Sequence, residues 1–140
     1  MARSKKKDNK KKSKPKQVFP EDLGEVVENI LRLQCYIIRL MRKGDKVYFF
    51  RSFGGNVEAE VAVEAVWQRL DRRKFCKADE FNICNIKEVR YCYHYMEGLH
   101  AVMPDEIIIK VSKSKKKRFR KKANACPTVT WGPPPKKAGM

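Results

Sequence analysis

The chain has 140 residues, 42% of them hydrophobic, and a formal net charge of +17. This length suits one domain with one core, and no apolar run is long enough for a membrane-spanning helix, so we expect no membrane partner. Residues 1–17 hold nine basic residues and one acid, and residues 113–140 hold ten basic residues and no acid. Residues 18–112 hold 14 basic and 15 acidic residues, which predicts a nearly neutral domain between two basic tails.

The two tails predict a polyanionic partner. Blocks of like charge stay disordered until such a partner neutralises them. Nucleic acid is the commonest one, because each neutralised phosphate releases counterions. An anionic membrane surface and a nuclear or nucleolar address are the alternatives for such lysine runs. The tail residues predicted to bind nucleic acid are Lys5, Lys6, Lys7, Lys10, Lys11, Lys12, Lys115, Lys116, Lys117, Arg118 and Arg120.

The domain predicted at 18–112 opens with a possible short strand at 18–19 and then a helix. Pro20-Glu21-Asp22 is typical of a helix start, and the apolar spacing predicts a helix over about 21–42 that stops at Gly44. The β-branched content of 34–40 favours a strand there instead, and this alternative stays open. Val47 to Phe50 then predict a strand over 46–51.

Gly54-Gly55 predicts a turn after this strand, because glycine permits backbone angles closed to other residues. Asn56 is a suitable N-cap, and the apolar positions from Val57 to Leu70 predict a helix over about 56–72. Residues 75–80 are interpreted as a polar connection.

Within residues 81–96, positions 89–96 alternate between two side-chain sets, which is typical of a strand. Tyr91, Tyr93 and Tyr95 form one set, and Arg90, Cys92, His94 and Met96 form the other. We expect a hairpin that joins 83–95 to the apolar run 106–112. An aromatic row of this kind is able to stack on bases, which makes Arg90, Tyr93 and His94 candidate nucleic-acid contacts. Core packing of the tyrosines is the alternative.

The five cysteines and two histidines do not form a metal-site pattern, because no Cys-x-x-Cys pair is present. The Lys-rich start has no apolar stretch behind it before residue 18, so a reducing compartment without disulfides is expected. Cys92 and His94 share one strand face through alternation alone. No other catalytic arrangement is visible, so we expect no enzyme activity, no cofactor and no metal.

The order of these elements and the stretch around Gly54 resemble the Alba superfamily. Its members carry an apolar strand that ends in a basic residue, then a glycine turn and a helix. Val47 to Arg51 match the strand, Gly54 matches the glycine, and Val57, Val61 and 63–66 match the helix face. The run Glu106–Ser112 looks like the last strand of the family.

The resemblance implies a small two-layer α+β domain, with two helices packed on a four-stranded mixed sheet and disordered basic tails. It also implies a homo- or heterodimer, with Arg51, Gly54 and Gly55 as nucleic-acid contacts. The expected function is that of a non-catalytic RNA-binding subunit of a ribonucleoprotein, of the ribonuclease P or MRP type. A ribosomal protein with tails threaded through RNA and a DNA-packaging chromatin protein are the alternatives. The expected location is the nucleus, the nucleolus or the cytoplasm.

Overall fold

The computed structural model describes residues 22–135, which fold into helices and two β-sheets. The helices are α2 (Glu25–Arg32), α3 (Val63–Arg69) and α4 (Lys116–Asn124), with short 3-10 turns at Gln34–Tyr36 and Ile86–Glu88. The strands are β2 (Ile37–Lys43), β3 (Lys46–Arg51), β4 (Val57–Ala59), β5 (Phe75–Lys77), β6 (Asn82–Asn85), β7 (Tyr91–Tyr95), β8 (Gly98–Val102), β9 (Ile108–Val111) and β10 (Thr130–Trp131). No helix in this part of the chain is long and apolar enough to cross a membrane.

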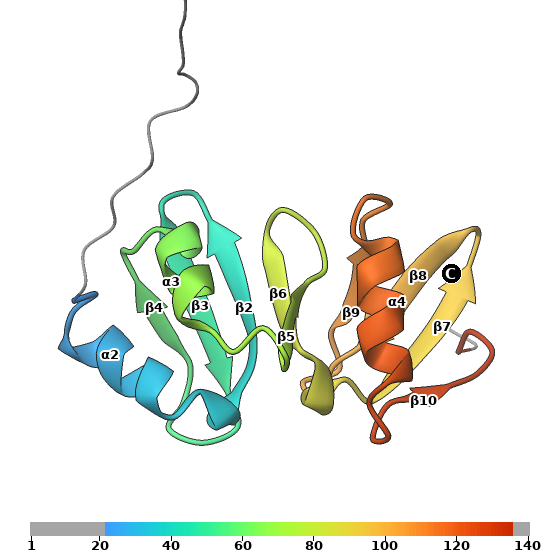
Figure 1. The fold of residues 1–140 in the computed structure, drawn as a ribbon, viewed down its shortest axis with the longest axis horizontal. Coiled ribbons are helices and arrows are strands. Elements are labelled where there is room, and N and C mark those ends of the chain that lie inside the picture. Colours follow the sequence, from blue (N-terminus) through green and yellow to red (C-terminus); the bar gives the residue numbers. More distant parts are fainter. Residues whose placement is uncertain (1–21, 136–140) are drawn as a thin grey trace, which may run out of the picture.

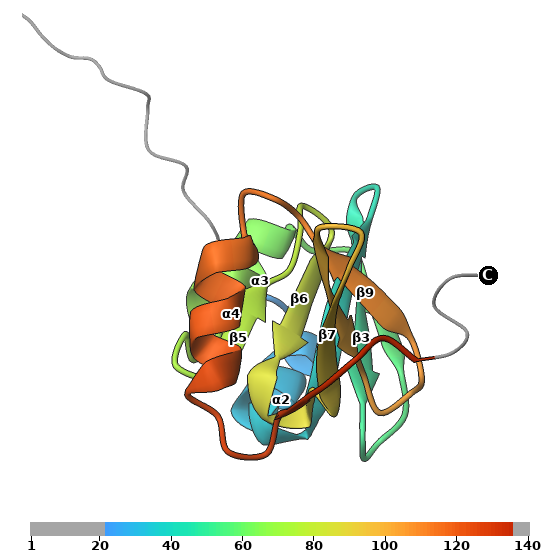
Figure 2. The ribbon, with the colours of Figure 1, turned by 90° about the vertical axis from the view of Figure 1, so that its right-hand side faces the viewer.

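The two sheets stand side by side, with the helices in front of them (Figure 1). The first sheet is antiparallel and has the order β4-β3-β2-β6-β5. The second has the order β10-β7-β8-β9, and only β10 runs parallel to its neighbour. Seen from the side, α4 is the outermost layer of its half of the molecule (Figure 2).

Each sheet contributes to a separate hydrophobic core. In the first, α2 and α3 pack on the first sheet, and Ile30, Phe49, Val66 and Phe75 are buried there. The second core lies where α4 and the second sheet meet the other face of β5 and β6. Strand alternation explains this division, because Phe75 and Cys76 point to opposite faces of β5.

A buried arginine connects the two sheets. Arg39 on β2 is 5% exposed, and its Nη2 lies 3.0 Å from a carboxylate oxygen of Asp105, in the loop before β9. Its guanidinium also lies 3.8 Å from the ring centroid of Phe50. A buried charge needs such a partner, so this pair holds the β8–β9 loop against the first sheet.

The predicted strand at 46–51 is confirmed as β3, but the predicted helix over 21–42 is wrong beyond Arg32. Residues 37–43 form β2, which pairs with both β3 and β6 in the middle of the sheet. This central position buries Ile37 to Leu40 on both faces, and β-branched residues fit it well. The strand alternative for 34–40 is therefore correct from Ile37 onward.

The predicted helix over 56–72 is also wrong in its first part. Residues 57–59 form β4 and pair with Val47 to Phe49, and the helix begins only at Val63. The apolar residues Val57, Ala59, Val61 and Val63 recur every second position, which is a strand period. Val57 and Val61 are also four residues apart, as are Ala59 and Val63, and this spacing is typical of a helix. The pattern therefore fitted the helix that was wrongly predicted. Residues 75–80, interpreted as a polar connection, contain the buried strand β5.

The hairpin predicted from 83–95 and 106–112 has a different pairing. Strand β8 lies between β7 and β9 and pairs with both. The 3-10 turn at Ile86–Glu88 also separates β6 from β7, and these two strands belong to different sheets. The α+β class is confirmed, but the two sheets differ from the single four-stranded sheet that the Alba resemblance implies.

The predicted C-terminal tail is the largest correction. Residues 116–124 form α4, and its side chains Phe119 and Ala123 are fully buried in the second core. Thr130 and Trp131 then add β10 to the edge of β7. Phe119 and Ala123 are four residues apart, so they share one face of the helix and hold this basic segment against the second core. The Lys-rich arm at 1–17 lies outside the described residues.

Glu28 predicts a pH dependence of stability. Its carboxylate accepts hydrogen bonds from Arg69 on α3, at 2.7 and 3.0 Å, and from the Leu23 backbone N–H at 2.9 Å. The hydrogen bonds with Arg69 and with this N–H lower the Glu28 pKa from 4.5 to about 2. Because the pKa is lower in the folded state, the stabilisation is present above pH 4.5 and is lost as the pH falls toward 2.

We therefore expect the stability difference between the wild type and Glu28→Gln to shrink as the pH falls from 4.5 to 2. Urea unfolding midpoints measured across this range check it. Glu25→Gln, an exposed change on the same helix, is the control and should show a smaller effect at every pH. A difference that grows on acidification would contradict the assigned role of Glu28.

Candidate nucleic-acid interface

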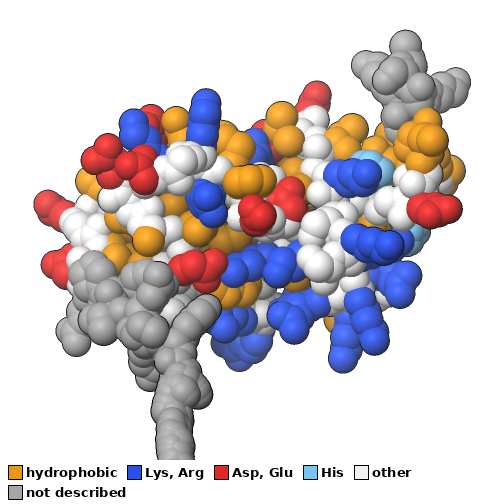
Figure 3. Space-filling model, turned by 90° about the horizontal axis from the view of Figure 1, so that it is seen from above, with side chains coloured by type: hydrophobic (Ala, Val, Ile, Leu, Met, Phe, Trp, Pro, Cys, Tyr) orange, Lys and Arg blue, Asp and Glu red, His pale blue; other side chains and the backbone are white. Residues whose placement is uncertain are grey.

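Helix α4 and the residues just before it carry a dense set of cations. Eight of the ten residues from 113 to 122 are basic: Lys113, Lys115, Lys116, Lys117, Arg118, Arg120, Lys121 and Lys122. Within residues 22–135, none of these eight forms an ion pair with a carboxylate, although other cations of the same region do. From above, Lys and Arg side chains gather over the half of the molecule that holds α4 (Figure 3).

The helical repeat spreads these cations over three sides of α4, while Phe119 and Ala123 occupy the buried side. Lys117 and Lys121 lie on the outer side. Lys116 lies toward the β7–β8 turn, where its Nζ donates to the Glu97 carbonyl at 3.0 Å.

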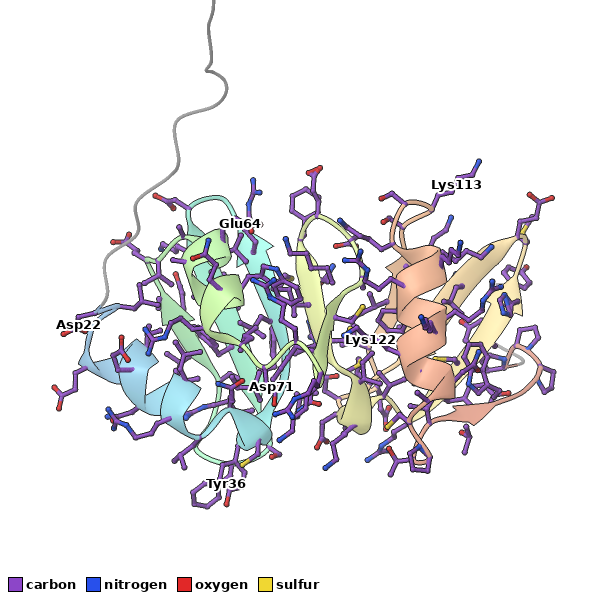
Figure 4. The ribbon with its side chains drawn as sticks, viewed as in Figure 1. Asp22, Tyr36, Glu64, Asp71, Lys113 and Lys122 are labelled. Atoms are coloured by element: carbon purple, nitrogen blue, oxygen red, sulfur yellow. The ribbon has the colours of Figure 1, made fainter. Side chains whose placement is uncertain are left out.

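The remaining side of α4 faces β5. Lys122 lies on this side (Figure 4), and its Nζ donates to the Arg72 carbonyl. Burial raises the pKa of the Cys76 thiol on β5, and the charges of Lys122, Arg118 and Lys115 act in the opposite direction. These three cations therefore lie close enough to β5 to act on this thiol, and Lys122 also contacts the loop before β5.

The structure brings together the five predicted contacts Lys115, Lys116, Lys117, Arg118 and Arg120, all on α4 or at its N-cap. Sequence reasoning did not select Lys121 and Lys122. Their position in the same basic run was the available signal. The predicted contacts Lys5, Lys6, Lys7, Lys10, Lys11 and Lys12 lie outside the described residues.

Arg51, Gly54 and Gly55 lie apart from this surface, on β3 and the β3–β4 turn, while α4 lies beside β5 at the other side of the sheet. The Arg51 guanidinium donates to the carbonyl of Gly54 at 2.6 Å and of Gly55 at 2.8 Å. Gly54 has a φ of +95°, and a Cβ there would lie 2.8 Å from Arg51 Nη2. Arg51 and the two glycines thus shape the turn itself.

In the aromatic row on β7, Tyr93 is buried, whereas Tyr91 and Tyr95 are half-buried. Tyr93 is 2% exposed, and its ring stacks on His100 with 5.0 Å between centroids. His94 is exposed and stacks on Trp131, while Arg90 is exposed at the start of β7. Tyr93 therefore has no free face for a base, and Arg90 and His94 belong to the β10 side of the second sheet.

The part of the chain that the structure describes, residues 22–135, gives no positive sign of a catalytic or metal site. Burial raises the pKa of the Cys92 thiol to about 12, so this thiol is protonated at neutral pH. Among the described residues, no group of three His, Cys, Asp or Glu side chains is placed to hold a metal ion. The absence of enzyme activity stays a prediction.

Comparisons with known proteins support the fold. No family model matches the chain, and no curated protein matches its sequence. Among solved structures, it is similar to the LytTr DNA-binding domain of a protein described as a methyl-accepting/DNA response regulator from Bacillus cereus. The TM-score is 0.56 at 18% sequence identity, over 63% of this chain and 81% of that chain. At this identity the likeness concerns the fold alone.

Proposed function

We propose that the protein binds nucleic acid without catalysing a reaction, and that α4 is its main contact surface. The observation that carries this proposal is the cationic surface of α4, which is fixed on the folded domain by Phe119 and Ala123. Because these cations have no carboxylate partner among the described residues, they are available for phosphates.

The charge distribution explains why nucleic acid is the favoured partner. Residues 22–69 hold seven basic and seven acidic residues, whereas residues 113–135 hold eight basic residues and no acid. The electrostatic attraction for phosphates is therefore concentrated at α4. Each phosphate contact releases a condensed counterion, so binding to such a surface weakens steeply with salt.

We propose duplex DNA as the first ligand to test, because the similar Bacillus cereus domain is described as DNA-binding. The cations on three sides of an outer helix also suit the phosphates on both sides of a wide groove. An RNA-binding subunit of a ribonucleoprotein is the second candidate. The Lys-rich residues 1–17 and the predicted resemblance to Alba proteins favour it.

A competition experiment tests the proposal and separates the two candidates. The full chain is bound to a fluorescent duplex of random sequence at salt concentrations between about 50 and 200 mM. Unlabelled duplex DNA and structured RNA then compete for it at equal nucleotide concentration. We expect the logarithm of the affinity to fall linearly with the logarithm of the salt concentration, and duplex DNA to compete better. Stronger competition by RNA would favour the second candidate, and no binding at the lowest salt would contradict the proposal.

A further inference from the structure

Some of the cations on α4 and at its N-cap, together with two cations near β5, lie along strand β5. This strand is the edge of the first sheet, with α4 next to one of its faces and α3 on the other. Arg118 and Lys122 of α4 and Lys115 at its N-cap lie close to β5. Two more, Arg72 and Lys77, come from the loop before β5 and from the strand itself. We call these five residues the β5 strip: Arg72, Lys77, Lys115, Arg118 and Lys122.

One contact and one shared cleft show that the two sides of the strip are close to each other. At one end, Lys122 Nζ donates to the Arg72 carbonyl. At the other end, Lys77 and Lys115 line the same cleft, which has a volume of about 400 Å³. That cleft is also lined by Glu64, Asp79 and Glu80, so the uniformly positive part of the strip ends there.

Trp67 of α3 contacts the two cations of the strip that do not belong to α4 or its N-cap, Arg72 and Lys77. The Arg72 guanidinium carbon lies 4.8 Å from the centroid of the indole ring, and Lys77 Nζ lies 5.0 Å from it. The ring is half-buried and packs against the first core, so it forms a rigid support. Glu64 also holds Lys77, with its Oε2 at 3.0 Å from Nζ. Cations above an indole face are attracted by its quadrupole, which restricts these two long side chains.

We propose that the phosphodiester backbone of the bound nucleic acid extends from α4 along the β5 strip, and that Trp67 is a positioning residue for this contact. The inference rests on the proposed function. A flexible Arg or Lys loses rotamer freedom when it binds a phosphate, and a side chain already held on an aromatic ring loses less. Trp67 thus strengthens two phosphate contacts without touching the phosphates.

The test compares Trp67→Leu with Trp131→Phe in the full chain. Trp131 is the matched control, because it is half-buried but lies on β10, in the other sheet. Two side chains that must then be ordered on binding are expected to weaken binding of duplex DNA by about 5- to 30-fold. The slope of log affinity against log salt concentration should also become shallower, by the equivalent of up to about two released counterions. Trp131→Phe should leave both quantities unchanged.

A cycle of variants separates positioning from simple destabilisation. Arg72→Gln/Lys77→Gln should weaken binding, and adding Trp67→Leu to it should cause little further loss, because the cations that Trp67 holds are already gone. The Trp131→Phe protein, whose remaining tryptophan is Trp67, should change its fluorescence when duplex DNA is added.

Three results would overturn the inference: equal affinity of Trp67→Leu and Trp131→Phe, a full additional loss in the triple variant, or an unchanged Trp67 fluorescence at saturation. Failure of the unmodified chain to bind any nucleic acid would contradict the proposed function instead.

Discussion

Charge reversal of Lys117, Arg118 and Lys121 to Glu is expected to weaken binding of duplex DNA at least about 100-fold at low salt. These side chains are exposed on α4, so the substitutions leave Phe119 and Ala123 in the core. The variant loses three phosphate contacts and places three negative charges beside the DNA. The slope of log affinity against log salt should fall by about three, which is one counterion for each lost contact.

Fluorescence anisotropy with a labelled duplex measures both quantities. The matched control is the charge reversal of Arg32, Lys43 and Lys110, three exposed cations on α2, β2 and β9. This control changes the net charge by the same amount, so it should weaken binding only modestly through the long-range field. Equal losses in the two variants would mean that net charge, and not the α4 surface, determines affinity.

Phe119→Ala is expected to lower the free energy of unfolding by about 3–5 kcal/mol. Phe119 is fully buried and is the largest side chain that α4 contributes to the second core. Its removal leaves a cavity between the helix and the second sheet. Only Ala123 then remains buried on α4, so the helix should detach from the domain before the rest unfolds.

Urea unfolding followed by circular dichroism gives the change in stability. Asn124→Ala, an exposed change on the same helix, is the control and should shift it by less than about 0.5 kcal/mol. A loss below about 1 kcal/mol for Phe119→Ala would show that α4 is not anchored by this side chain.

The sequence predicted the elements whose pattern was unambiguous. Strand β3 combines β-branched and aromatic residues between Gly44 and Gly54, and it has the predicted bounds. The α+β class followed from the mixture of periods. In contrast, residues 57–63 satisfy a period of two and a spacing of four at once, so the local pattern alone was not decisive. Pairing with β3 determines the outcome, and this is a tertiary effect.

The candidate site was found only in part for a related reason. The α4 cations were visible in the sequence as a basic run. The high charge of this run predicted a disordered tail, and the helix that Phe119 and Ala123 anchor was therefore missed. The contact between Trp67 and Arg72 or Lys77 joins a helix to a later loop and strand, and no local pattern encodes it. The β3–β4 turn illustrates a different point. Arg51 was predicted to contact nucleic acid, and the structure shows that its guanidinium binds the turn that follows it, so the nucleic-acid contact stays a prediction.

The dense charge of α4 has a consequence for the protein without its ligand. Like charges recur at four-residue spacing in Lys116–Arg120, Lys117–Lys121 and Arg118–Lys122, and such pairs together destabilise a helix by about 1 kcal/mol. Added salt screens this self-repulsion, so it should raise the melting temperature of the free protein. The same salt is expected to weaken the proposed complex with nucleic acid, because it opposes counterion release. Ionic strength is therefore expected to act with opposite signs on the free protein and on the proposed complex, so the buffer that best preserves the fold differs from the one that favours binding.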